Sequence, residues 1–211
     1  MFSDQDLAVM DSIIKRYPRS RSAIMPLLHY AQSKAGYVTN EGIELIAKLL
    51  TIETAEVSAV ATFYTQYKRK PVGEYHVGVC TNTLCAVMGG DAIFAGLKEH
   101  LGIENDGVTA DGKVSLEHIE CNAACDYAPV VMANWEFYDN QTVESAKALV
   151  DGARAGNPPA PTRGPNRLVT YKQASAVLAG LDDGLAGEGV QAGPATLLGL
   201  GIARAGEKGG K

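Results

Sequence analysis

The stretch PVGEYHVGVCTNTLC, residues 71–85, marks the point where the chain changes from one kind of structure to another. Before it, apolar residues recur at three- and four-residue steps, which is the pattern of amphipathic helices. Within it, apolar residues alternate with polar or small ones from Glu74 to Val79, and this alternation predicts a half-buried strand. The strand ends at Cys80, and a second cysteine, Cys85, follows five positions later.

Residues 1–70 are predicted to form a small bundle of four short helices. Ser3, with Asp6 three residues later, has the pattern of a capping box, and Thr39 is placed to cap a later helix. Gly36 suits the C-terminal end of the helix before it. The four apolar stripes are Leu7, Met10, Ile13 and Ile14, then Ile24, Leu27, Leu28 and Ala31, then Ile43, Ile46, Leu49 and Leu50, and finally Val57, Val60 and Tyr64.

Residues 71–155 are predicted to form a small α/β domain. After the first strand, DAIFAGLKEHLG at 91–102 has a helical pattern, and KVSLEHIEC at 113–121 is a second strand. PVVMANWEFYDN at 129–140 holds two more strands joined by a tight turn, and Thr142 then caps a last helix. This order of elements is thioredoxin-like and predicts a four-stranded sheet. The fold class is therefore α+β: a helical bundle, this α/β domain, and an extended C-terminal tail.

Residues 156–211 have the composition of a linker or tail. They hold 12 of the 23 glycines, five of the nine prolines and a single aromatic residue, Tyr171. Their apolar residues gather in RLVTYKQASAVLAGL at 167–181, which can form one short helix, and in TLLGLGIARAG at 196–206. The segment has too little apolar surface for a core of its own. We expect a strap with two anchors that becomes ordered on a partner, the alternative being a solvated tail.

Composition and charge exclude several classes of protein. Lys and Arg number 19 against 24 Asp and Glu, a formal charge of -5, so a nucleic-acid partner is not expected. No apolar run approaches the about 18 residues that a membrane-spanning helix needs, so direct membrane insertion is not expected either. The acidic start, MFSDQDLAVMDS, is neither a secretory signal nor an Arg-rich transit peptide. These features predict a protein of the bacterial cytoplasm.

The chain has four cysteines, Cys80, Cys85, Cys121 and Cys125, which form two local pairs. Each pair follows a predicted strand, so neighbouring strands would bring the sulfurs to one edge of the sheet. Four thiolates hold a [2Fe–2S] cluster, two on each iron. Zinc also takes four thiolates, although its loops are commonly Cys-x2-Cys, and disulfides are rare in a reducing cytoplasm. The residues alone favour an iron–sulfur cluster and leave structural zinc or unrelated cysteines as alternatives.

Two longer stretches resemble a known family. VATFYTQYKRKPVGEYHVGVCTNTLCAVMGG at 60–90, followed by LEHIECNAACDYAPVVMAN at 116–134, is similar to the thioredoxin-like [2Fe–2S] ferredoxins. Within that family the chain resembles the NuoE-type subunit of respiratory complex I, a type shared with NAD-linked hydrogenases and formate dehydrogenases. The motifs that carry the resemblance are ATFY, P-x-G-x-Y, both cysteine pairs and the AP after the second pair. The resemblance covers about residues 5–155.

The resemblance implies one [2Fe–2S] cluster per chain, with Cys80 and Cys85 on one iron and Cys121 and Cys125 on the other. It implies an electron-transfer subunit of NADH:quinone oxidoreductase, in a peripheral arm on the cytoplasmic face of the bacterial plasma membrane. The implied partners are a flavoprotein subunit of the NuoF type, which binds FMN and NADH, and a large iron–sulfur subunit of the NuoG type. No catalytic residue or independent active site is expected in this chain. The alternatives are the equivalent diaphorase subunit of an NAD-linked hydrogenase or formate dehydrogenase, and a zinc-stapled structural adaptor.

Overall fold

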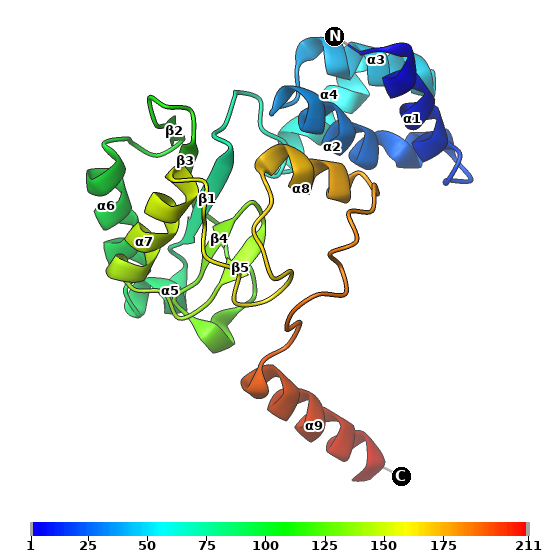
Figure 1. Ribbon diagram of the computed structural model, residues 1–211. Helices are drawn as coiled ribbons and strands as arrows, with labels where there is room; N and C mark the ends of the chain where they lie inside the picture. Colours follow the sequence, from blue (N-terminus) through cyan, green and yellow to red (C-terminus); the bar gives the residue numbers. More distant parts are fainter. Residues whose placement is uncertain (1, 210–211) are drawn as a thin grey trace. The chain divides into compact units, whose positions relative to one another are not determined.

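The computed structural model describes residues 2–209, which form two compact units. The first unit contains the residues up to Tyr75 together with Val169–Asp183. The second contains His76–Leu168 together with the residues from Gly184 onwards, so the chain enters each unit twice (Figure 1). Within residues 2–209, each helix is either too short or too polar to cross a lipid bilayer.

The first unit is built from helices whose ends follow local sequence signals. Ser3 and Asp6 form the predicted capping box, with the Asp6 N–H donating to Ser3 Oγ at 3.2 Å and the Ser3 N–H donating to the Asp6 carboxylate at 2.9 Å. Thr39 caps the third helix, and Gly36 ends the second with φ +84°. The elements are α1 (Asp4–Ile14), the 3-10 turn η1 (Ser20–Ala23), α2 (Ile24–Ala35), α3 (Asn40–Leu50), α4 (Thr54–Phe63) and α8 (Tyr171–Leu178).

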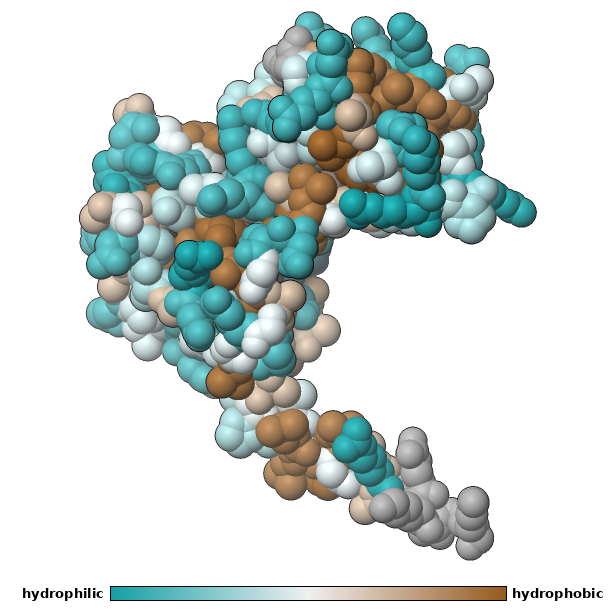
Figure 2. All heavy atoms as spheres, turned by 45° about the vertical axis from the view of Figure 1, so that its right-hand side comes forward, coloured by the Kyte–Doolittle hydropathy of each residue, from teal (hydrophilic) through white to brown (hydrophobic). Residues whose placement is uncertain are grey.

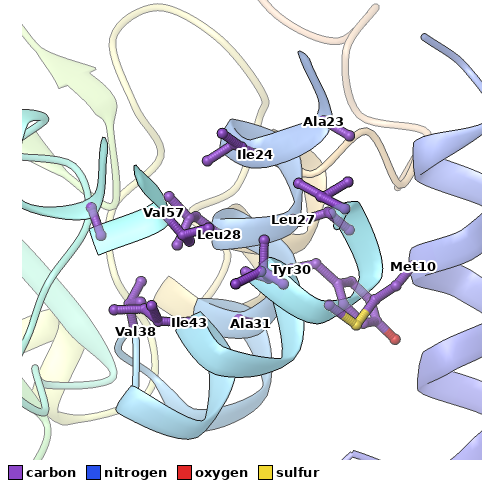
Figure 3. Close-up of a cluster of buried hydrophobic side chains, with 14 of the residues drawn as sticks. Met10, Ala23, Ile24, Leu27, Leu28, Tyr30, Ala31, Val38, Ile43 and Val57 are labelled. Carbon is purple, nitrogen blue, oxygen red and sulfur yellow. The ribbon is translucent and has the colours of Figure 1, made fainter. Parts of the chain in front are cut away.

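One shared core holds these helices together. Leu27 and Leu28 of α2 are fully buried, and they belong to a cluster with Met10 of α1, Ile43 of α3 and Val57 of α4 (Figure 3). Short helices of this length are marginal in isolation, so their stability comes from this packing. The predicted four-helix bundle is therefore present, with α2 contacting each of the other three bundle helices.

Helix α8 packs against α2, although its residues were expected to become ordered only on a partner protein. Tyr171 and Ser175 of α8 are buried, and Ser175 Oγ accepts a hydrogen bond from Gln32 Nε2 at 3.3 Å. Gln32 Nε2 also donates to the Gln66 carbonyl at 3.1 Å, and Gln32 Oε1 accepts from the Lys68 N–H at 2.8 Å. The predicted short helix is confirmed. The expectation that this segment becomes ordered only on another protein is wrong, because α8 packs within the chain's own helical unit. A contact between this segment and a partner protein stays a prediction.

The second unit contains a sheet of five strands in the order β2-β3-β1-β4-β5, where four were predicted. The additional strand, β2, pairs antiparallel with β3 and is only two residues long, too short to leave an alternating pattern in the sequence. The elements of this unit are β1 (Tyr75–Cys80), α5 (Thr83–Val87), α6 (Gly90–Leu101), β2 (Gly107–Val108), β3 (Val114–Ile119), the 3-10 turn η2 (Cys125–Tyr127), β4 (Val131–Ala133), β5 (Glu136–Tyr138), α7 (Val143–Arg154) and α9 (Pro194–Gly209).

Strand β1 lies in the middle of this sheet. All six of its residues are buried, so the prediction of a half-buried strand was wrong. Its polar residue, His76, is accommodated because its ring nitrogens lie 3.0 Å from Ser115 Oγ and 2.9 Å from a Glu117 carboxylate oxygen, both on β3. On the other side, β1 runs antiparallel to β4, and β4 turns into β5 at Asn134 and Trp135, which both have positive φ. This turn is the one predicted from the sequence.

Helices α6 and α7 lie side by side and both contact β3 (Figure 1). They approach closely at Gly96, where a Cβ atom would come within 2.7 Å of Val143 Cγ1. Helix α6 ends at Gly102 with φ +65°, and Thr142 Oγ1 caps α7 by accepting from the Ser145 N–H at 3.2 Å. Both of these helix ends agree with the sequence prediction.

Part of the expected tail is also attached to this unit. The Thr162 N–H donates to the Phe137 carbonyl at 2.8 Å, and Arg163 forms a bidentate ion pair with Asp139, with both N–O distances 2.8 Å.

Further on, α9 carries exposed apolar residues, seen as brown spheres near the C-terminal end in Figure 2. These are Leu197, Leu198, Leu200 and Ile202.

Candidate metal centre

The first pair of thiols is buried at the end of β1. Cys80 is the last residue of that strand, and Cys85 lies in the short helix α5, where a loop was expected. Their exposed fractions are 2% and 3%. A Cβ atom at Gly90 would lie 2.5 Å from the Cys80 carbonyl oxygen and 2.9 Å from that of Cys85. Only glycine therefore lets α6 begin directly against both cysteines.

The second pair is exposed and follows β3. Cys121 Sγ and Cys125 Sγ are 3.9 Å apart, and Cys125 begins the 3-10 turn η2 rather than lying in an irregular loop. Between them Ala123 has φ +55°, a left-handed conformation that is uncommon for a residue with a Cβ atom. Its N–H donates to Cys121 Sγ at 3.3 Å. The local backbone therefore turns back toward the sulfur.

Two contacts join the segments that carry the thiol pairs. Asn82 Nδ2, in the first cysteine loop, donates to the carbonyl of Ile119 at the end of β3 at 3.3 Å. A Cβ atom at Gly78 of β1 would lie 2.7 Å from Ile119 Cγ2, so glycine allows this close packing. The ends of β1 and β3, which lead into the two cysteine pairs, are thus held against each other as predicted.

The thiols influence one another electrostatically. Burial is the largest cause that raises the pKa of the Cys85 thiol, to about 11. The hydrogen bond between Cys85 and Cys80 and negative charge at Cys125 also raise this pKa. The Val130 N–H acts the other way on this pKa by donating to the sulfur. The pKa of Cys125 is also raised, chiefly by its hydrogen bond with Cys121. The raised pKa values of Cys85 and Cys125 favour their protonated forms, so a bound cationic centre would replace these two protons.

Apolar residues surround the buried side of the site. Cys80 and Cys85 belong to a hydrophobic cluster with Ala124, Ala128, Val130 and Met132, against which Ile119, Trp135 and Phe137 pack. One thiol pair is thus enclosed in an apolar environment while the other faces the surface.

The donor set fits a cluster with two metal atoms. The four thiols form two pairs, and each iron of a [2Fe–2S] cluster takes two thiolates. The Ala123 N–H already donates to Cys121 Sγ, and the backbone of Val130 lowers the pKa of Cys85; both effects stabilise anionic sulfur.

Sequence reasoning selected the four cysteines but missed the residues that shape their surroundings. Gly90 and the preceding Gly89, which has φ +112°, were visible only as an adjacent glycine pair soon after Cys85. Asn82 and Asn122 left a weaker signal, an amide residue placed inside each cysteine loop.

Comparison with known proteins assigns the family. The sequence model of the thioredoxin-like [2Fe–2S] ferredoxins matches residues 10–154 of this chain, more than half of its length. The chain belongs to the thioredoxin-like [2Fe–2S] ferredoxin family. The resemblance stated from the sequence motifs is therefore confirmed, and so is the expected α+β fold with a thioredoxin-like domain.

Several members of this family are close in sequence. The chain is 61% identical over 194 residues to a Mycobacterium tuberculosis protein named as the E subunit of NADH-quinone oxidoreductase, covering 91% of this chain and 76% of that protein. The Mycobacterium bovis protein of the same name gives the same values. A Rickettsia bellii protein, also of this name, is 43% identical over 156 residues, which cover 72% of this chain and 93% of that protein.

A solved structure supports the fold. A crystal structure of an NAD+-reducing [NiFe]-hydrogenase aligns with 64% of this chain and 23% of the hydrogenase chain, at a TM-score of 0.56 and 20% sequence identity. Because the identity is low, this likeness concerns the fold of this ferredoxin-family chain and not its reaction.

Proposed function

We propose that this chain is the electron-transfer subunit of a bacterial NADH:quinone oxidoreductase and that it binds one [2Fe–2S] cluster through Cys80, Cys85, Cys121 and Cys125. The observation that carries the proposal is the presence of two adjacent thiol pairs in a chain 61% identical to the Mycobacterium tuberculosis protein named as the E subunit of NADH-quinone oxidoreductase. In this proposal Cys80 and Cys85 hold one iron, and Cys121 and Cys125 hold the other.

The residues of the chain support this role in distinct ways. When bound, the cluster supplies one-electron transfer. The apolar residues around Cys80 and Cys85 exclude water from one side of the site, and the Ala123 N–H stabilises charge on Cys121 Sγ. The pair Cys121 and Cys125 is exposed, so this is the side at which the redox centre of a partner protein can approach.

The proposed setting is a complex of several subunits. The partners are a flavoprotein subunit of the NuoF type, which holds FMN and NADH, and a large iron–sulfur subunit of the NuoG type. The complex would place the chain in a peripheral arm on the cytoplasmic face of the plasma membrane, without an active site of its own. We further propose that residues 1–70 serve as a docking element, that residues 71–155 carry the cluster, and that residues 156–211 form an attached C-terminal extension.

The iron–sulfur assignment is tested by replacing one proposed ligand. Cys121→Ser is expected to lose most of the bound iron and labile sulfide, because a hydroxyl oxygen replaces thiolate poorly on iron. Iron, sulfide and the visible absorption of the purified protein are the measurements. Thr81→Ser, which changes a neighbour of Cys80 but no thiol, serves as the control and should remain loaded.

Two outcomes would contradict the assignment. A Cys121→Ser protein with full iron and sulfide would exclude Cys121 as a ligand. A colourless wild-type protein that contains zinc and no sulfide would replace the electron-transfer role by that of a zinc-stapled adaptor.

A further inference from the structure

Asn122 contains a buried hydrogen-bond donor without an acceptor. Its side-chain nitrogen Nδ2 is inaccessible to solvent and has no hydrogen-bond partner in the part of the chain that the structure describes. A buried donor left unsatisfied costs about 1–3 kcal/mol, and such groups are rare in native proteins. A ligand that supplies an acceptor is one of the few explanations for them.

The position of Asn122 identifies the kind of acceptor. It follows Cys121 directly and lies within the loop that ends at Cys125, whose two sulfurs are 3.9 Å apart. The next residue, Ala123, already donates its backbone N–H to Cys121 Sγ. One donor of this loop is thus already directed at a sulfur atom, and Asn122 Nδ2 belongs to the residue between that donor and Cys121.

The other cysteine loop provides an internal comparison. Asn82 lies between Cys80 and Cys85 as Asn122 lies between Cys121 and Cys125. Asn82 Nδ2, however, already donates to the Ile119 carbonyl at 3.3 Å. The two asparagines thus differ in that one is satisfied by the protein and the other is not.

We propose that the Asn122 side-chain amide donates a hydrogen bond to a sulfur atom of the bound cluster and thereby raises its reduction potential. This inference rests on the proposed [2Fe–2S] site, which supplies the missing acceptor. An oxidised cluster with four thiolates carries a formal charge of roughly -2, and reduction adds one electron and one negative charge. A donor to sulfur stabilises the more negative form more strongly, so it favours reduction. Asn122 is therefore a residue that sets the potential and not a catalytic residue.

The test compares reduction potentials of loaded full-length proteins. Asn122→Leu keeps the approximate shape of the side chain but removes the donor. We expect it to change the ratio of reduced to oxidised cluster about tenfold at a given potential, which lowers the midpoint by about 59 mV for one electron. Asn122→Ser, which keeps a hydroxyl donor, should recover part of this shift. Asn82→Leu is the matched comparison: it should lower thermal stability, and its effect on the midpoint should be clearly smaller than that of Asn122→Leu, because the Asn82 amide already donates to the Ile119 carbonyl.

A spectroscopic measurement on the wild-type protein supports the comparison of variants. With 15N in the side-chain amides of asparagine, the reduced cluster should show a hyperfine coupling to 15N that persists in Asn82→Leu. If Asn122→Leu does not bind iron, its midpoint cannot be measured, and the 15N coupling of the wild-type protein is then the test. Absence of this coupling in the labelled wild-type protein overturns the proposed hydrogen bond from Asn122.

The outcomes separate this inference from the proposed function. A fully loaded Asn122→Leu protein with an unchanged midpoint, or a coupling lost only in Asn82→Leu, overturns the role of Asn122 and leaves the cluster in place. A wild-type protein without iron and sulfide overturns both proposals.

Discussion

His29 is a buried residue whose protonation depends on the fold. Its ring lies on α2 with its centroid 4.7 Å from that of Tyr67, and burial lowers its pKa from 6.5 to about 4. Between pH 6.5 and pH 4 the unfolded chain therefore binds a proton that the folded chain does not. The stability of the helical unit is fully present above pH 6.5 and falls as the pH decreases, by about 3 kcal/mol at pH 4.

The corresponding experiment replaces His29 by phenylalanine, which retains an aromatic ring beside Tyr67. Between pH 7 and pH 5 the wild-type free energy of unfolding should fall by about 2 kcal/mol more than that of His29→Phe. Denaturant unfolding at both pH values provides the measurement. Asp6, whose pKa is held below its usual range chiefly by its hydrogen bond with Lys34, adds acid sensitivity to both proteins equally. Parallel pH profiles would exclude His29 as the cause.

At the scale of single residues, the sequence predicted what depends on local chemistry. Ser3, Thr39 and Thr142 were recognised as caps because a cap satisfies backbone groups only two or three residues away. The cysteines were assigned as cluster ligands because four thiols in two local pairs are typical of a metal site in a reducing compartment, and this assignment stays a prediction. Gly90 was missed, because its importance comes from carbonyl groups that only the folded chain brings close to it.

At the scale of elements, α6 and α7 offer a test of how closely two helices can pack. Alanine normally stabilises a helix interior relative to glycine by up to about 1 kcal/mol. At Gly96, however, the added Cβ would lie 2.7 Å from Val143 Cγ1. Gly96→Ala should therefore destabilise the second unit by about 1–3 kcal/mol through overpacking.

The control for this prediction removes the opposing methyl groups. Gly96→Ala combined with Val143→Ala should recover part of the loss relative to the sum of the two single variants, as measured by thermal unfolding. If the two changes are strictly additive, the helices do not meet at this point.

The elements that the sequence left unassigned are short. The strand β2 has two residues and α5 has five, so neither is long enough for an amphipathic pattern to repeat. Helix α8 was predicted correctly as a helix, because Thr170 and eight helical residues give a local signal. Its packing partner was not predicted, because the sequence pattern of an apolar stripe does not specify which surface covers it.

At the scale of the whole molecule, α8 makes the C-terminal region part of the N-terminal unit. A chain that ends at residue 155 loses the buried side chain of Tyr171 and the Ser175 acceptor of Gln32. We expect its helical unit to be less stable by roughly 3 kcal/mol, the magnitude of a large truncation in a core. A chain that ends at residue 183 keeps α8 and should match the full-length protein. Equal thermal unfolding of the two truncated chains would show that α8 contributes little.

The contact between α2 and α8 also has a consequence for synthesis of the protein on the ribosome. Helix α2 ends at Ala35, whereas Ser175 lies 140 residues further along the chain. At typical translation rates, roughly 7–28 s pass between the synthesis of these two points. During this interval α8 does not yet pack against Gln32 and the rest of the α2 surface. The helical unit is thus the first to emerge from the ribosome, but it cannot complete its packing until α8 has been synthesised. Until then, the nascent chain needs protection of this exposed surface from contacts with other proteins.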